Sequence, residues 1–261
     1  MDLGLKDKTA LVLGAGGGLG RAIALALAQE GARLALGDID GGALEETRRE
    51  VAALGSDAMA IRWDLADLDA IDQNVGAIET QLGPADVLVN NTGGPPPTPA
   101  LGQSADLWRK HFEAMVLSCI TLSDRVVPGM RARKWGRVIT SASSGVVAPI
   151  PNLAVSNALR LSLVGWSKTL AREIGRDGVT ANVIVPGRIA TKRIVALDQA
   201  KAVREARSVE QVSTESTAAI AIGRYGDPRE YGASVAFLAS TQASYITGSV
   251  VRIDGGLIAS I

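Results

Sequence analysis

A serine and an arginine stand four residues apart in the stretch LAVSNALR, at Ser156 and Arg160. The apolar residues around them recur at helical spacing, so both side chains are expected on one face of a helix. A hydroxyl and a protonated, forked cation can donate hydrogen bonds to an oxygen that gains negative charge. Ser156 and Arg160 are therefore catalytic candidates, and they predict polarisation of a carbonyl.

A cluster of glycines stands where the first strand pattern gives way to a helix, in LVLGAGGGLGRAIALALA. Gly14, Gly18 and Gly20 let the backbone turn tightly and approach a pyrophosphate, whose charge is favoured by the N-terminus of the following helix. About 20 residues later Asp38 ends the second strand pattern, where a carboxylate accepts hydrogen bonds from an adenosine ribose. Ile39 follows it, and no adjacent arginine neutralises a 2′-phosphate. The spacing predicts a dinucleotide site that favours NAD over NADP.

Alternating strands and helices are expected to position these residues. Short aliphatic or β-branched runs alternate with helix-length segments along the whole chain. This alternation predicts βαβ units in a single Rossmann-type α/β domain over residues 1–261, with a doubly wound parallel sheet and helices on both faces. The strand patterns are TALVLG, RLALGD, AMAIRWD, ADVLVNN, GRVITSAS and TANVIVPG.

The composition limits the class of protein. Of the 261 residues, 47% are hydrophobic, and 27 basic side chains balance 27 acidic ones. Balanced charge without a long basic run gives no reason to expect nucleic acid or a membrane as a partner. No apolar run approaches the roughly 20 residues that span a bilayer, so we expect a soluble cytoplasmic protein. The single cysteine, Cys119, is expected to be buried, and the sequence predicts no metal site.

Two segments depart from the alternation of strands and helices. Gly93 to Gly102 is rich in proline, and residues from Gly187 to about Ile222 form a polar, helical insertion. In a doubly wound sheet ligands bind beyond the carboxyl ends of the strands, so both segments are expected to wall the site, the second as a lid over the substrate. Six basic residues of the insertion suit either an anionic group on the substrate or a solvated face. They are Arg188, Lys192, Arg193, Lys201, Arg204 and Arg207.

The chain resembles the short-chain dehydrogenase/reductase family throughout its length. Besides the glycine spacing G-x-x-x-G-x-G, it carries WDLAD, NNTGG, SASSG, VPGRIAT and YITGSVVRIDGG in that order. The resemblance implies an NAD(H)-dependent oxidoreductase that interconverts a carbonyl and a hydroxyl on a small organic substrate, as a 3-oxoacyl reductase does, and assembly as a homotetramer or homodimer. It implies that the cofactor lies against Gly14, Gly18, Leu19, Gly20, Asp38, Ile39, Asp64, Leu65, Asn91, Thr92, Gly93, Arg160, Pro186, Gly187, Ile189 and Thr191.

The same resemblance breaks at the catalytic motif. The family carries a serine, a tyrosine 13 residues later, a lysine four residues further, and an asparagine on the preceding helix. Ser143 matches the serine, but Ser156, Arg160 and Met115 stand at the other three positions. A serine hydroxyl is a far weaker acid than a tyrosine, and arginine stays protonated, so the usual proton donor is missing. If hydride is transferred, the proton is expected to come through water or from the substrate.

Three functions stay open at this point. The first is an oxidoreductase with a modified site. The second is an NAD-binding protein without redox turnover, a sensor or an inert subunit, which the simultaneous loss of tyrosine, lysine and asparagine favours. The third is non-redox chemistry on a bound substrate, because function resides in the site and not in the fold. His111, the single histidine, lies one turn before Met115 and serves either as a relay to the site or as an ordinary helix-flank residue.

Overall fold

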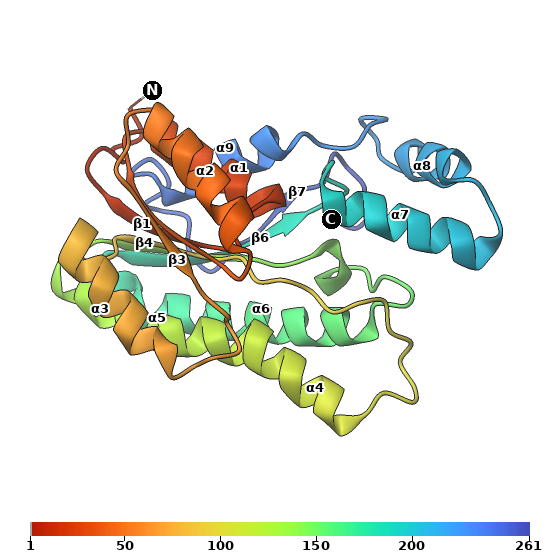
Figure 1. Cartoon of the computed structure of the whole chain (residues 1–261), viewed down its shortest axis with the longest axis horizontal. Helices are drawn as coiled ribbons and strands as arrows, with labels where there is room; N and C mark the ends of the chain where they lie inside the picture. The colour runs from red at the N-terminus through yellow and green to blue at the C-terminus, as the bar shows by residue number, and fades with distance from the viewer. Residues whose placement is uncertain (1) are drawn as a thin grey trace.

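A parallel sheet of seven strands forms the centre of the molecule in the computed structural model, which describes residues 2–261 (Figure 1). The strands lie in the order β3-β2-β1-β4-β5-β6-β7, and each neighbouring pair is parallel. Their bounds are β1 Thr9–Leu13, β2 Arg33–Asp38, β3 Ala58–Arg62, β4 Val87–Asn90, β5 Gly136–Ser141, β6 Val179–Pro186 and β7 Val250–Ile253. The predicted doubly wound parallel sheet is confirmed.

Helices cover both faces of this sheet (Figure 1). One face carries α1 (Gly18–Gln29), α2 (Gly41–Ala53) and α9 (Pro228–Ala239), and the other carries α3 (Ala70–Leu82), α5 (Ser118–Ala132) and α6 (Ala154–Ile174). The remaining helical segments are α4 (Ala105–Phe112), η1 (Glu113–Leu117), η2 (Ser144–Val146), η3 (Gly175–Asp177), α7 (Lys192–Glu205) and α8 (Val209–Ala218). Across residues 2–261, none of the helices combines the length and the apolar character that crossing a bilayer requires.

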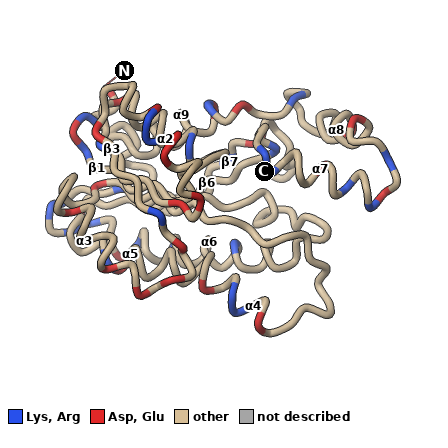
Figure 2. Tube along the Cα trace, in the orientation of Figure 1, with Lys and Arg blue, Asp and Glu red and all other residues tan. Residues whose placement is uncertain are grey.

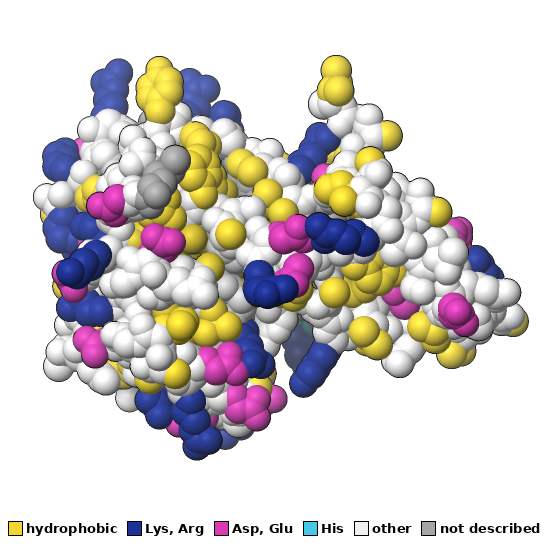
Figure 3. Space-filling view, turned by 90° about the horizontal axis from the view of Figure 1, so that it is seen from above, with side chains coloured by type: hydrophobic (Ala, Val, Ile, Leu, Met, Phe, Trp, Pro, Cys, Tyr) yellow, Lys and Arg dark blue, Asp and Glu magenta, His cyan; other side chains and the backbone are white. Residues whose placement is uncertain are grey.

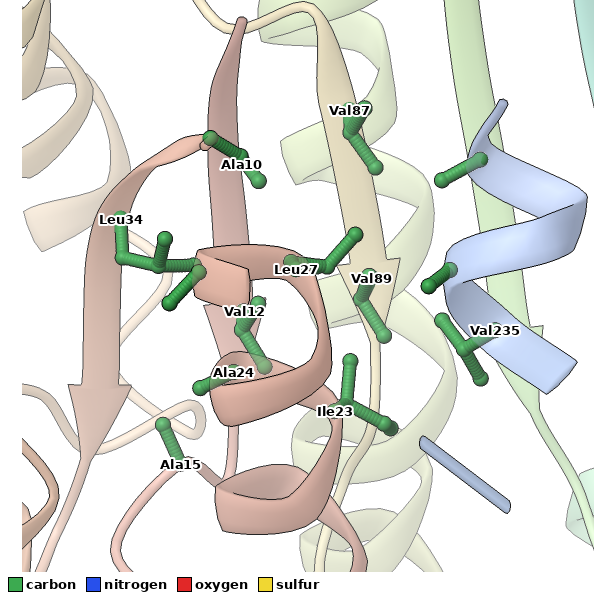
Figure 4. Close-up of a cluster of buried hydrophobic side chains, with 14 of the residues drawn as sticks. Ala10, Val12, Ala15, Ile23, Ala24, Leu27, Leu34, Val87, Val89 and Val235 are labelled. Carbon is green, nitrogen blue, oxygen red and sulfur yellow. The ribbon is translucent and has the colours of Figure 1, made fainter. Parts of the chain in front are cut away.

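The strands are apolar on both faces because both faces are covered. In β1, Ala10 and Val12 belong to the core under α1, whereas Leu11 and Leu13 belong to the core on the opposite face. Alternate residues of a strand point to opposite sides, so one short strand supplies both cores. Figure 4 shows the first core, where Ile23 and other α1 side chains lie over β1, β2 and β4 beside α9.

Helices α1 and α9 cross at close range over this core. A Cβ on Gly232 of α9 would lie 2.4 Å from the carbonyl oxygen of Ala22 and 3.3 Å from the Cβ of Ala26, both in α1. Only a glycine allows backbone to approach backbone so closely. The start of α1, which borders the phosphate loop, is therefore fixed in part by a residue more than 200 positions away in the sequence.

The order of the strands creates a switch point between β1 and β4. From β1 the chain continues to β2 and β3 on one side, and it then returns to β4 on the other side of β1. The loops after β1 and β4 diverge there and leave a crevice at the carboxyl edge, where doubly wound sheets bind ligands. Helices α7 and α8 follow β6 and extend to the right of the sheet in Figure 1, and Figure 2 shows basic positions on α7 and acidic positions on α8.

The crossing of α1 and α9 gives a test of packing. We expect Gly232→Ala to lower the free energy of unfolding by about 1–3 kcal/mol, because the added methyl meets a backbone carbonyl that cannot move aside. Gly165→Ala is the matched control, since that glycine also lies in a helix, α6, and an added Cβ meets nothing within 4 Å. It should raise the free energy by roughly 0.5–1 kcal/mol through helix propensity. Urea denaturation measures the free energy of unfolding of both variants. Equal changes in the two would show that the helix crossing tolerates a side chain at position 232.

Candidate active site at the carboxyl ends of the strands

Loops that follow the strands surround one large cleft, with a volume of about 1590 Å³. Its walls include the start of α1, the proline-rich loop after β4, the first turns of α6 and the inner side of α7. In the view of Figure 3 a hollow separates the main body from the part that holds α7 and α8. The cleft therefore lies at the edge where the strand order predicts a ligand site.

Nearly all the predicted site residues line this cleft. Those of the cofactor set are Gly14, Gly18, Leu19, Asp38, Ile39, Asp64, Leu65, Asn91, Thr92, Gly93, Arg160, Pro186, Gly187, Ile189 and Thr191, and the catalytic candidates Ser143 and Ser156 line it too. Gly20 is buried instead, beneath the loop. A Cβ on Gly20 would lie 1.9 Å from the carbonyl oxygen of Gly14, so its part is to let the loop fold onto α1.

The glycine loop leaves the start of α1 open to an anion. Gly14 has a φ of 61° and Gly18 a φ of 52°, values that side chains rarely allow. Gly17 precedes the helix in an extended conformation, no side chain caps the helix, and its first turn holds no acidic residue. The first N–H groups of a helix have no partners within it, and the helix dipole favours negative charge there. The loop therefore fits the pyrophosphate of a dinucleotide.

Asp38 is tied into the same loop. The Gly16 N–H donates to Asp38 Oδ2 at 2.8 Å, and the Asp40 N–H donates to Asp38 Oδ1 at 2.9 Å. A Cβ on Gly16 would lie 3.0 Å from this carboxyl group, so a side chain at this position would require the carboxylate to shift. Gly16 was absent from the predicted set, although it stands in the same glycine cluster as Gly14 and Gly18. The carboxylate is thus fixed at the end of β2, where it lines the cleft.

Arg160 is buried at the junction of two strand ends. It is 8% exposed, its Nη1 donates to the Ser141 carbonyl at 3.1 Å, and its Nη2 donates to the Thr92 and Gly93 carbonyls at 3.0 Å each. Burial lowers the pKa of Arg160, and the charge of Arg193 lowers the pKa further. The guanidinium therefore braces the loop after β4 against the end of β5.

The two candidate serines lie in different parts of the same wall. Ser143 caps η2, and its Oγ accepts a hydrogen bond from the Gly145 N–H at 3.1 Å. Ser156 is 7% exposed and lies one turn before Arg160 on α6, as the helical spacing predicts. Asn157, next to Ser156, turns away and donates from Nδ2 to the Ile150 carbonyl at 2.9 Å. Two hydroxyls and one buried cation thus border the cleft.

Met115 lies in η1, a single π-helical stretch that joins α4 to α5. Its side chain is buried with Val155 and Leu159 of α6, at the edge of the cleft. His111 lies in the last turn of α4, half-buried at the cleft, and burial together with Lys110 lowers its pKa. Among residues 2–261 no group of three or more His, Cys, Asp and Glu side chains is arranged to hold a metal ion.

Tyr231 supports the site from beneath without touching the cleft. It is fully buried in α9, its Oη forms a 2.8 Å hydrogen bond with Ser141 Oγ, and burial raises its pKa. Ser141 also supplies one of the carbonyls that accept from Arg160. Neither Tyr231 nor Ser141 was predicted as a site residue, because no spacing rule connects α9 to the end of β5.

Ion pairs neutralise most of the basic residues between 188 and 207. Arg188 pairs with Asp198, whose other oxygen accepts from Tyr225 Oη at 2.7 Å. Three more cations pair with two glutamates, Glu205 and Glu215: Lys201, Arg204 and Arg207. Lys192 and Arg193 also line the cleft but form no ion pair with a carboxylate of residues 2–261, and Arg193 Nη2 donates to the Pro95 carbonyl at 2.8 Å.

A family model and several known relatives match nearly the whole chain. A family model described as "Enoyl-(Acyl carrier protein) reductase" matches residues 14–258. A 3-oxoacyl-(acyl-carrier-protein) reductase, FabG, of Vibrio cholerae serotype O1 is 33% identical over 259 residues, which cover 98% of this chain and 99% of the relative. Nodulation protein G of Azospirillum brasilense is 35% identical over 256 residues, which cover 97% of this chain and 99% of the relative.

Solved structures of reductases also superpose on nearly the whole chain. L-sorbose reductase from Gluconobacter frateurii, complexed with NADPH and L-sorbose, superposes with a TM-score of 0.94 at 30% identity and covers 100% of both chains. YwfH, an NADPH-dependent reductase involved in bacilysin biosynthesis, superposes with a TM-score of 0.92 at 28% identity and covers 97% of this chain and 99% of its own.

The thiol next to the site gives a test of its burial. Cys119 is fully buried, as predicted, and burial raises its pKa to about 12. Since the thiolate is the reactive species, we expect iodoacetamide at pH 8.5 to alkylate the native protein at least roughly a hundredfold more slowly than the urea-unfolded protein. Mass spectrometry of timed samples measures both rates. Similar rates would show that this part of the core opens readily.

Proposed function

The chain belongs to the short-chain dehydrogenase/reductase family of oxidoreductases, and from that premise we propose that it interconverts a carbonyl and a hydroxyl on a small organic substrate with NAD(H) as its cofactor. One observation carries the proposal. The cleft retains every element that a dinucleotide needs, namely an uncapped helix start, a glycine loop and a fixed carboxylate at the end of β2. A nicotinamide dinucleotide bound there would supply or accept a hydride.

The preference for NAD(H) rests on Asp38. Both oxygens of this carboxylate accept backbone N–H groups, so its negative charge stays at the position expected for the adenosine ribose. A 2′-phosphate would meet that charge, and Ile39 beside it is 59% exposed and apolar. NADPH is the cofactor named for L-sorbose reductase and for YwfH. We propose that Asp38 separates this chain from those two proteins.

Ser143, Ser156 and Arg160 are proposed as the catalytic residues. We place Ser156 and Arg160 where the family carries its tyrosine and lysine. A carbonyl oxygen in the cleft would accept hydrogen bonds from the two serine hydroxyls, while the nearby positive charge of Arg160 stabilises a developing oxyanion. All three hydrogen bonds of Arg160 go to backbone carbonyls, so it acts as a fixed charge. Neither serine is acidic enough to supply the proton near pH 7, and water or the substrate supplies it.

A second candidate function is NAD binding without redox turnover, as a sensor or as an inert subunit. The hydrogen bonds of Arg160 favour it, since a guanidinium that is occupied by three carbonyls can be purely structural. The buried Met115 favours it as well. Non-redox chemistry such as hydration, which the fold permits, would be excluded by strict dependence on NAD.

The surroundings of the site complete the proposal. We propose that α7 and α8, within residues 187–222, form a lid over the substrate, because the side chains of α7 line the outer part of the cleft. We further infer a single domain from the unbroken alternation of strands and helices, a cytoplasmic location from the composition, and assembly as a homotetramer or homodimer from the resemblance to the family. The substrate is taken to be a small molecule, with neither nucleic acid nor membrane as a partner.

Cofactor preference gives the first test. We expect NADH to bind at least about tenfold more tightly than NADPH, because the Asp38 carboxylate repels a 2′-phosphate. Asp38→Asn should reduce this ratio to a few-fold. Glu46→Gln is the matched control, since Glu46 also lines the cleft and is exposed, and it should leave the ratio unchanged. Fluorescence titration gives both dissociation constants, and tighter binding of NADPH by the unaltered protein would refute the preference.

Turnover gives the second test. We expect the protein to oxidise NADH with at least one member of a panel of diketones, cyclic ketones and acyl thioesters. Arg160→Ala should lower kcat/KM by more than roughly a hundredfold while NADH binding persists, because the fixed positive charge is lost. Initial rates of NADH absorbance give kcat/KM.

The double variant Ser156→Tyr, Arg160→Lys separates the two candidate functions. If only this variant oxidises NADH, the native protein binds NAD for another purpose. Unchanged kcat/KM in Arg160→Ala would show that the arginine is structural. Circular dichroism of each variant confirms that it has folded, because Arg160 joins two strand ends.

A further inference from the structure

Two guanidinium groups approach one glycine in the outer part of the cleft. A Cβ built on Gly94 would lie 3.5 Å from Arg193 Nη2 and 3.6 Å from Arg160 Nη2. Gly94 itself is exposed, and all three residues line the cleft. The two cations come from α6 and from α7, so the fold brings them together across the proline-rich loop.

No carboxylate of residues 2–261 compensates these two charges. The three hydrogen bonds of Arg160 and the one bond of Arg193 go to neutral backbone carbonyls. Burial is the main cause that lowers the pKa of Arg160, to which Arg193 adds a smaller contribution of the same sign, and burial also lowers the pKa of Arg193. By contrast, Arg188, Lys201, Arg204 and Arg207 are all in ion pairs.

We propose that Arg160, Arg193 and Gly94 form a subsite for a carboxylate on the substrate, which makes the substrate a keto or hydroxy acid; this assignment rests on the proposed function. A carboxylate carries two oxygens in one plane. Arg193 would donate charge-assisted hydrogen bonds to it, while Arg160, whose Nη2 already donates to the Thr92 and Gly93 carbonyls, adds a fixed positive charge. Glycine at position 94 leaves the space between the two cations open. Lys192, which also lines the cleft, adds positive charge at the entrance.

The pyrophosphate of the cofactor is the rival anion for these cations. Its expected place is the start of α1, where Gly18 lies beside Thr191, with 3.6 Å between a Cβ on the glycine and the threonine Cγ2. Gly94 follows β4 and lies beside Arg160 of α6 instead. The subsite therefore borders the place of the substrate and the catalytic serines.

Calorimetry with the NAD⁺-loaded protein tests the subsite without any turnover. The probes are acetoacetate and its neutral counterpart 2,4-pentanedione, which differ in one terminal group. We expect Arg193→Gln to weaken binding of acetoacetate at least about tenfold and to change binding of 2,4-pentanedione less than twofold. Arg193→Lys should recover part of the loss because it keeps the charge.

Two further variants distinguish a specific subsite from a general effect of removing a positive charge. Gly94→Ala keeps both charges but fills the space between them, and it should also weaken acetoacetate selectively. Arg207→Gln removes a cation that is paired with Glu205 and Glu215 and does not line the cleft, and it should change neither probe. Binding of acetoacetate that is equal in all four variants, or equal losses for both probes, would overturn the proposal.

Two other results would reassign the cations. Loss of NAD⁺ binding in Arg193→Gln would make them cofactor contacts, and tighter binding of inorganic phosphate than of acetoacetate would overturn the choice of a carboxylate. Selective binding of acetoacetate by a protein that never oxidises NADH would refute the proposed reduction alone. Failure of the subsite would leave that reduction standing, since neutral ketones remain as substrates.

Discussion

A buried positive charge organises the carboxyl edge of the sheet. Arg160 reaches three backbone carbonyls, those of Ser141, Thr92 and Gly93, and none of its hydrogen bonds goes to a carboxylate. Removing a cation from water is costly unless hydrogen bonds replace its hydration. Three charge-assisted bonds supply that replacement, and they join the end of β5 to the loop after β4. The loops that define the cleft are thus fixed by one side chain, which Tyr231 supports through Ser141.

Arginine at position 160 explains both how the two strand ends are held together and why this residue cannot transfer a proton. Its planar fork reaches carbonyls on two separate strand ends, for which the compact ammonium of a lysine is less suited. The same three bonds hold it as a fixed charge that cannot exchange a proton near pH 7. In the proposed reaction, polarisation therefore comes from this charge and from the hydroxyls of Ser143 and Ser156. Burial of Met115 is consistent with this, because an apolar side chain has no group that could hold a water molecule by hydrogen bonds.

Much of the fold and of the cofactor site could be predicted from the sequence. Strand and helix patterns have periods that a short window reveals, so the doubly wound sheet followed from local information, and the positions of Gly14 and Asp38 followed from it. Contacts between distant segments could not be predicted. Tyr231 meets Ser141 across 90 positions, and only the folded sheet brings them together. The bond from Gly16 to Asp38 was missed for the same reason.

The charges of residues 187–222 show a second limit of prediction from the sequence. Counting between 188 and 207 finds an excess of basic residues, yet Glu215, outside that window, pairs with both Lys201 and Arg207.

Arg193 lies at the cleft without a carboxylate partner among residues 2–261, and it is close to Arg160, which is itself a buried cation. Bracing the two strand ends requires Arg160 alone, and a second guanidinium nearby works against it by repulsion. Such an arrangement gains stability once an anion lies between the two charges. The proposed carboxylate subsite would relieve this repulsion.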